Sequence, residues 1–145
     1  MLGNRYFIAR QFDKAVTYLE QALSESPGSV DIIKKLIICY IETGDVEKAF
    51  NHFYRLVQKD PHIIVNTDLY YDDCPCTELI PKWKQKEKSS QVKENLYLGL
   101  AMLYLYCNLE KSIEYFEKVK RITRQQNKIL SILKKLKSLR QVSHK

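Results

Sequence analysis

Apolar residues recur along this chain at the spacing typical of amphipathic helices. Within residues 2–10, 13–25, 30–43 and 46–59, apolar side chains return at intervals of three and four positions. That interval brings side chains onto one face of an α-helix, so the pattern predicts four helices in the first part of the chain. Pro27 and Pro61 follow the second and fourth stretches, and proline cannot continue a helix because it lacks an N–H group.

The same residue types also recur 34 positions apart. The recurring residues are Tyr6, Ala15 and Pro27, which return as Tyr40, Ala49 and Pro61. Self-similarity at a fixed period of this length is typical of stacked helical hairpins. Alanines let two antiparallel helices approach closely, and the larger side chains fill the space beside them. Residues 1–61 are therefore predicted to form two hairpins of the same construction.

These positions resemble the tetratricopeptide repeat. The first copy keeps Leu2, Gly3, Tyr6, Phe12, Ala15, Leu19, Ala22 and Pro27, and the second keeps Leu36, Tyr40, Gly44, Ala49, Phe53 and Pro61. A weaker third copy lies at residues 96–119, with Ser112 in the alanine place and Phe116 in the aromatic one. The resemblance implies an all-α fold, a right-handed superhelix of about three helical hairpins with an inserted loop and a C-terminal capping helix.

An insertion separates the second copy from the third. Ser112 follows Ala49 by 63 positions, 29 more than one repeat. Pro75 and Pro81 predict irregular chain there, with one short helical piece near residues 77–83. We expect a single domain with repeats at about 1–27, 28–61 and 92–124, the insertion at about 62–91 and the capping helix at about 125–142.

The family resemblance implies a noncatalytic role in which the first helix of each hairpin lines a concave groove for a peptide or a partner helix. The groove positions that follow from the register are Phe7, Lys34, Lys35, Ile38, Ile41, Tyr97 and Tyr104. Of the residues with which one subset of the family grips a terminal carboxylate, only Asn4 matches. A hydrophobic or mixed peptide is therefore the expected ligand.

Charge divides the chain into an acidic and a basic part. Residues 1–81 hold 8 Lys and Arg against 12 Asp and Glu, a net charge of −4, whereas residues 82–145 hold 16 against 5, a net charge of +11. The basic residues of the last predicted helix are Lys128, Lys134, Lys135, Lys137 and Arg140. They raise an alternative function, binding of a nucleic acid or another polyanion. The absence of aromatic residues after Arg124 favours a solvated helix face instead.

The chain offers little for catalysis. His52, His62 and His144 are scattered, no nucleophile-and-base arrangement is visible, and we expect neither enzymatic activity nor a cofactor. Cys74 and Cys76 lie among carboxylates and are weak candidates for a metal site, because a structural zinc site needs a second ligand pair. Redox chemistry is the other alternative for these thiols. No apolar run is long enough to span a membrane and no signal segment is visible, so a cytoplasmic location is expected.

Overall fold

Helices make up 77% of the structure, and no strand occurs in the residues that it describes. This computed structural model describes residues 1–89 and 93–143, with side chains as far as Arg140. The all-α expectation is confirmed. The chain divides into two compact units, Met1–Phe53 and Tyr54–Lys145. No helix within the described ranges is long and apolar enough to cross a membrane.

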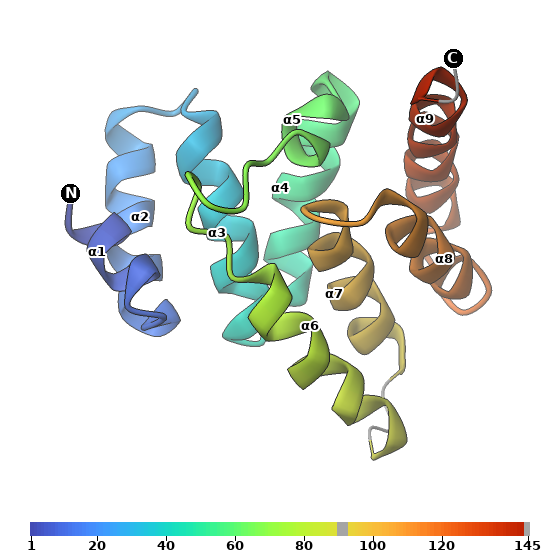
Figure 1. Cartoon of the computed structure of the whole chain (residues 1–145), viewed down its shortest axis with the longest axis horizontal. Helices are drawn as coiled ribbons and strands as arrows, with labels where there is room; N and C mark the ends of the chain where they lie inside the picture. Colours follow the sequence, from blue (N-terminus) through green and yellow to red (C-terminus); the bar gives the residue numbers. More distant parts are fainter. Residues whose placement is uncertain (90–92, 144–145) are drawn as a thin grey trace. The chain divides into compact units, whose positions relative to one another are not determined.

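The first unit consists of two helical hairpins, as the repeat period predicts. Its elements are α1 (Leu2–Ile8), α2 (Phe12–Glu25), α3 (Val30–Glu42) and the first part of α4 (Val46–Lys59) (Figure 1). Ser29 begins α3, since its hydroxyl accepts a hydrogen bond from the Ile32 N–H at 3.4 Å. In the same way the Asp45 carboxylate accepts one from the Lys48 N–H, at 3.3 Å, at the start of α4.

The turns inside the two hairpins have the same backbone path. Arg10 and Gly44 both have positive φ angles, 62° and 92°. The next residue donates its N–H to a tyrosine carbonyl in each case, Gln11 to Tyr6 at 2.9 Å and Asp45 to Tyr40 at 2.8 Å. The repeat period therefore holds at the level of single hydrogen bonds.

An aromatic stack closes each hairpin at equivalent positions. Tyr6 stacks on Tyr18 with ring centroids 5.4 Å apart, and Lys14 lies over the Tyr6 ring at 5.7 Å. In the second hairpin, Tyr40 stacks on His52 at 5.9 Å and Lys48 lies over Tyr40 at 5.6 Å. Each stack joins a first helix to a second one, and each lysine adds an attraction to the ring face.

Close helix contact in the first hairpin depends on Gly3. A Cβ atom at this position would lie 2.9 Å from the Leu19 side chain and 3.2 Å from its backbone nitrogen. Leu19 is fully buried. A larger residue at position 3 would therefore push α1 away from α2.

The second unit contains the inserted segment, the third hairpin and the basic helix. Its elements after the end of α4 are α5 (His62–Val65), α6 (Cys76–Gln85), the 3₁₀ turn η1 (Lys86–Lys88), α7 (Lys93–Leu105), α8 (Leu109–Lys120) and α9 (Gln126–Ser143). Helix α7 packs against both α6 and α8, and α8 packs against α9 (Figure 1). The last helix reaches back to α4, where the Gln58 side chain donates to the Ser131 hydroxyl at 2.8 Å.

Helix α6 contains the short helical piece expected near residues 77–83. Pro81 lies inside this helix. Its side chain is exposed, so the ring meets solvent and a short helix tolerates the lost N–H. Trp83 lies against Gly99 of α7, where a Cβ atom would come within 2.7 Å of the indole. The insertion thus covers part of α7.

The third hairpin differs from the first two at its turn. Cys107 occupies the place of Arg10 and Gly44, but it is not among the described residues with positive φ. Asn108 then begins α8, because its side chain accepts a hydrogen bond from the Lys111 N–H at 3.1 Å. Ser112 is completely buried, and its hydroxyl donates to the Ala101 carbonyl at 2.7 Å. A serine can therefore stand in the alanine place because its polar atom has a partner.

Candidate partner-binding surfaces

Most of the apolar residues expected to line a groove are buried. Phe7 and Ile41 are 0% exposed, Ile38 is 2% and Tyr104 is 7%. Phe7 packs edge-on against Phe12, with ring centroids 6.0 Å apart. The expectation that these four side chains are exposed is wrong, because α3 and α7 are apolar around most of their circumference and periodicity does not reveal which sides are covered.

Two lysines on α3 keep contact with solvent. Lys34 is half-buried, and the Lys35 side chain is 13% exposed. The Lys35 ammonium pairs with the Asp31 carboxylate at 2.9 Å, one helical turn earlier, and lies 6.0 Å from the centre of the Phe7 ring. These contacts fix the direction of Lys35, and the ion pair offsets part of its positive charge.

Asn4 of α1 carries a buried oxygen without a hydrogen-bond donor. In the part of the chain that the structure describes, its Oδ1 is the buried side-chain atom with no partner. Buried polar atoms in proteins are nearly always paired, so an unpaired one needs an explanation. An N–H group from a bound peptide backbone is a donor of the right kind.

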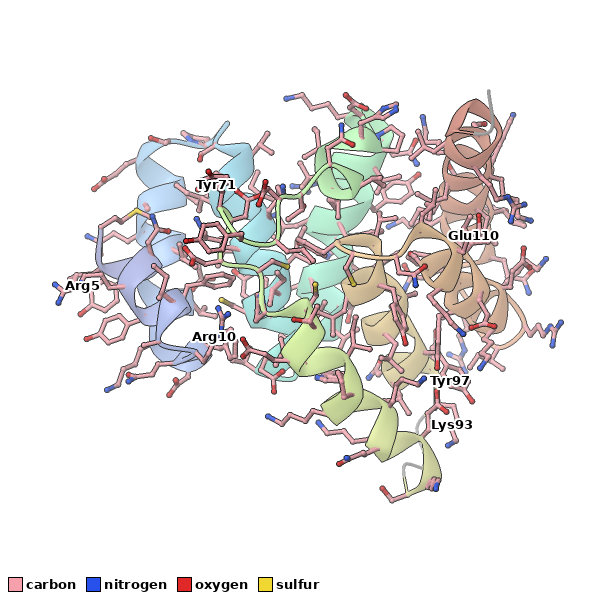
Figure 2. All side chains as sticks on the ribbon, viewed as in Figure 1. Arg5, Arg10, Tyr71, Lys93, Tyr97 and Glu110 are labelled. Carbon is pink, nitrogen blue, oxygen red and sulfur yellow. The ribbon has the colours of Figure 1, made fainter. Side chains whose placement is uncertain are left out.

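A cluster of tyrosines and one lysine lies on α7 and α8 in the second unit. Tyr115 stacks on Tyr104 at 5.4 Å and contacts Tyr97 at 5.9 Å. The Lys118 ammonium lies 4.5 Å from the centre of the Tyr115 ring and 5.3 Å from that of Tyr97. Tyr97, which Figure 2 labels on α7, and Lys118 are both half-buried, so they are the members that reach solvent.

A hydrogen bond to the insertion holds this tyrosine cluster in place. The Tyr115 hydroxyl donates to Glu87 Oε1 of η1 at 2.6 Å. Burial and, next, this carboxylate raise the pKa of Tyr115 above its usual value of 10.0. Sequence reasoning missed Tyr115, Lys118 and Glu87. Tyr115 could have been found, since it follows His52 by the same interval that separates Ala49 from Ser112.

The five basic residues proposed for polyanion contacts have different surroundings. Lys137 pairs with Glu117 of α8 at 2.7 Å, and Arg140 pairs with Glu110 at 3.2 Å. Lys128 lies over the Tyr54 ring at 5.3 Å, whereas Lys134 is exposed and Lys135 is half-buried. The ion pairs direct part of the positive charge of α9 towards α8, which leaves less of it for phosphate groups.

The cysteine-containing loop is joined by a residue that sequence reasoning did not connect with it. The neighbouring thiols, Cys107 first and then Cys74, raise the pKa of the Cys76 thiol above its usual value, and burial adds to this rise. Within the described residues, however, no group of three or more Cys, His, Asp or Glu side chains is arranged to hold a metal ion. The sequence places Cys107 at the turn before α8. It does not show which other segment of the chain lies near that turn.

Comparison with known proteins identifies one segment of the chain. A family model described as tetratricopeptide repeat matches residues 6–62. The BBSome complex member BBS4 of Bos taurus is 30% identical over 61 residues, which is 42% of this chain and 12% of that relative. The chain thus spans about an eighth of the length of the relative it matches. No solved structure matches the chain significantly.

Proposed function

We propose that this chain, whose residues 6–62 match the tetratricopeptide repeat family, is a noncatalytic module that binds an extended peptide carrying acidic side chains. Tetratricopeptide repeats generally mediate protein–protein interaction. The matching relative is a member of a protein complex, and its family and name point to a scaffold rather than an enzyme. We propose a part in a protein assembly for this chain as well.

The unpaired oxygen of Asn4 carries the proposal. A peptide bound in extended form has free N–H groups along its backbone, and one of them would satisfy Asn4 Oδ1 once this half-buried side chain turns its amide oxygen towards the peptide. Lys34 and Lys35 lie on α3 of the same unit and would attract carboxylates of such a peptide. Because the apolar candidates on α1 and α3 are buried, hydrogen bonds and charge rather than apolar anchors would supply specificity.

The second unit, taken by itself, offers a separate aromatic contact for a protein partner. Tyr97 presents part of its ring to solvent, and the neighbouring Lys118 carries a positive charge. An aromatic face beside a cation suits a peptide side chain that combines an apolar body with a negative end. Tyrosine is enriched at interface hot spots, and its rigid ring loses little conformational entropy on binding.

Parallel affinity purifications test the proposal. The full chain and its variants would be used as bait in the same cell extract, and the bound proteins would be quantified by mass spectrometry. We expect specific partners whose capture falls at least about tenfold with Asn4→Ala or with the double charge reversal Lys34→Glu and Lys35→Glu.

Matched controls use residues of the same type elsewhere. Lys84→Glu with Lys88→Glu reverses two exposed lysines of the insertion, and Tyr70→Ala removes an exposed tyrosine. These variants should retain every partner. If all partners were captured equally by the Asn4 and Lys34/Lys35 variants, the proposed surface would be wrong.

A further inference from the structure

The loop between α5 and α6 carries two adjacent tyrosines whose side chains lie in solvent. Tyr70 is 83% exposed and Tyr71 is 81% exposed (Figure 2). The other eight tyrosines of the chain, all of them in its described part, are buried or half-buried. Large aromatic side chains gain free energy from burial, so a pair that stays in solvent has no part in the core. The hydroxyl groups of this pair are the most accessible phenols of the chain.

Backbone hydrogen bonds give this loop a defined shape. The Asp68 carboxylate oxygen Oδ1 accepts from the Tyr70 N–H at 3.0 Å and from the Tyr71 N–H at 2.9 Å. The Cys74 N–H donates to the Leu69 carbonyl at 3.1 Å, and the Cys74 side chain is buried. The end of the loop is therefore anchored in the second unit, while the two tyrosine rings remain in solvent.

The chain around the two tyrosines lies outside any helix. Residues 66–75 separate the end of α5 at Val65 from the start of α6 at Cys76. An enzyme that modifies a side chain must bind several residues on each side of it, and a helix would first have to unfold. The hydrogen bonds to Asp68 are exposed, and water replaces such bonds at small net cost. The loop can therefore adapt to an enzyme's active site without disturbing the core.

The sequence around the tyrosine pair is acidic. Three aspartates lie within three positions of both tyrosines: Asp68, Asp72 and Asp73. Residues 60–81 contain no lysine or arginine. An enzyme with positively charged groups along its substrate cleft is attracted to such a segment, whereas one that recognises basic residues is not.

We propose that Tyr70 and Tyr71 are phosphorylation sites, modified by a protein tyrosine kinase whose substrate cleft is basic. Their exposure, the absence of helix around them and the acidic flanks carry this inference together. It is independent of the peptide-binding proposal, because its test follows the covalent state of the loop rather than the capture of a partner.

The reaction balances with ATP as the phosphoryl donor. The tyrosine oxygen attacks the γ-phosphorus of ATP, and a new O–P bond forms. The bond from the γ-phosphorus to the oxygen that bridges to the β-phosphorus breaks, and ADP leaves with the electron pair. The phenol proton passes to a carboxylate of the kinase. The phosphate brings a charge of about −1.5 to −2 at neutral pH, so an acidic loop becomes more acidic still.

The tyrosines are the acceptors in preference to the neighbouring threonines. The Thr67 hydroxyl donates to the Ile64 carbonyl at 2.6 Å, and its side chain is half-buried. Thr77 lies in the first turn of α6, which would have to unfold before a kinase could bind it. Neither restriction applies to Tyr70 and Tyr71, whose rings contact each other with centroids 5.4 Å apart and remain exposed.

The first experiment incubates the full, folded chain with magnesium ATP and a recombinant tyrosine kinase domain that phosphorylates a copolymer of glutamate and tyrosine. Peptide mapping by mass spectrometry should place the phosphate on Tyr70 or Tyr71. Tyr70→Phe with Tyr71→Phe should reduce incorporation at least about tenfold, because the other tyrosines must first be exposed by local unfolding. The matched control, Tyr18→Phe with Tyr54→Phe at half-buried positions, should leave incorporation unchanged.

A second pair of variants tests the acidic flanks. Asp72→Asn with Asp73→Asn should slow phosphorylation, because the attraction to a basic cleft is reduced. Asp13→Asn with Glu47→Gln makes the same change in net charge at exposed positions of the first unit and should leave the rate unchanged. Equal slowing by both pairs would overturn the assignment of a basic cleft to the kinase.

The second experiment expresses the full chain in mammalian cells, adds a tyrosine-phosphatase inhibitor and maps the modified peptides. Phosphate on Tyr70 or Tyr71 is the expected result. The proposal is overturned if neither tyrosine is modified, if a half-buried tyrosine or a threonine is the main acceptor, or if the added group resists a phosphatase, as sulfate would. Because the mapping uses the unaltered chain, this result does not depend on the folding of any variant.

Discussion

Arg10 and Gly44 hold the same left-handed turn position in successive repeats, with φ angles of 62° and 92°. Residues with a Cβ atom adopt positive φ at a cost of about 1–2 kcal/mol, which glycine avoids. The first hairpin therefore carries a strain that the second does not. The Arg10 guanidinium partly offsets it by donating to the Phe7 carbonyl at 3.4 Å.

This difference predicts opposite effects of substitution at the two turns. Gly44→Ala should lower the free energy of unfolding by about 1 kcal/mol, because only the backbone angle opposes the new Cβ atom. Arg10→Gly should have the opposite sign and raise stability by less than about 1 kcal/mol, since glycine also gains entropy in the unfolded chain. Urea denaturation measures both, with Gly28→Ala as the control at a glycine with open space around it. A stabilising effect of Gly44→Ala would contradict the left-handed backbone conformation at position 44.

Gly99→Ala should loosen the inserted helix from α7. The added methyl group would approach the Trp83 indole to 2.7 Å, and such overpacking costs about 1–3 kcal/mol. Trp83 is the single tryptophan of the chain, so its fluorescence should shift to longer wavelength as the indole becomes exposed. Trp83→Leu should make the same glycine substitution less harmful, because residues in contact show non-additive effects. If Gly99→Ala lowered the free energy of unfolding equally with Trp83 and with Leu at position 83, the contact between Gly99 and Trp83 would not be the cause.

Alkaline pH should destabilise the chain through two tyrosines. Burial, followed by a hydrogen bond to a carboxylate, raises the pKa of Tyr40 beside Glu20 and of Tyr115 beside Glu87 above 10.0. Because the folded-state pKa is the higher one, the contribution to stability is complete below about pH 10 and decreases as the pH rises above that value. Thermal denaturation between pH 8 and about 11 measures the loss, which Tyr40→Phe and Tyr115→Phe should each reduce. If stability decreased with pH in both variants as it does in the unaltered chain, the two tyrosines would not be the cause.

Freeing the paired charges of α9 should increase binding to nucleic acid. Glu117→Gln and Glu110→Gln together remove one carboxylate partner each from Lys137 and Arg140. A short DNA duplex at low salt should then bind more tightly, with a steeper dependence of affinity on salt concentration. Fluorescence anisotropy measures this, and Glu47→Gln with Glu78→Gln gives the same change in net charge at exposed positions outside α8. Equal gains in both variants would show that net charge alone is responsible.

Local features of this fold could be predicted from sequence, whereas contacts between distant segments could not. The three-to-four spacing placed α2, α3 and α4 almost to the residue, because helix period and proline stops are local properties. The burial of Ile38 and Ile41 was missed, since an apolar residue on a largely apolar helix gives no sign of which neighbour covers it.

The side-chain stacks of the first unit have a consequence for the order of folding. Tyr6 and Tyr18, like Tyr40 and His52, belong to neighbouring helices of one hairpin, so closing either loop loses little chain entropy. Each hairpin can therefore form early and locally. The hydrogen bond between Gln58 and Ser131 joins residues 73 positions apart and must wait until the chain between them is ordered. Docking of the basic helix is thus expected to be the slow, final step in the assembly of the second unit.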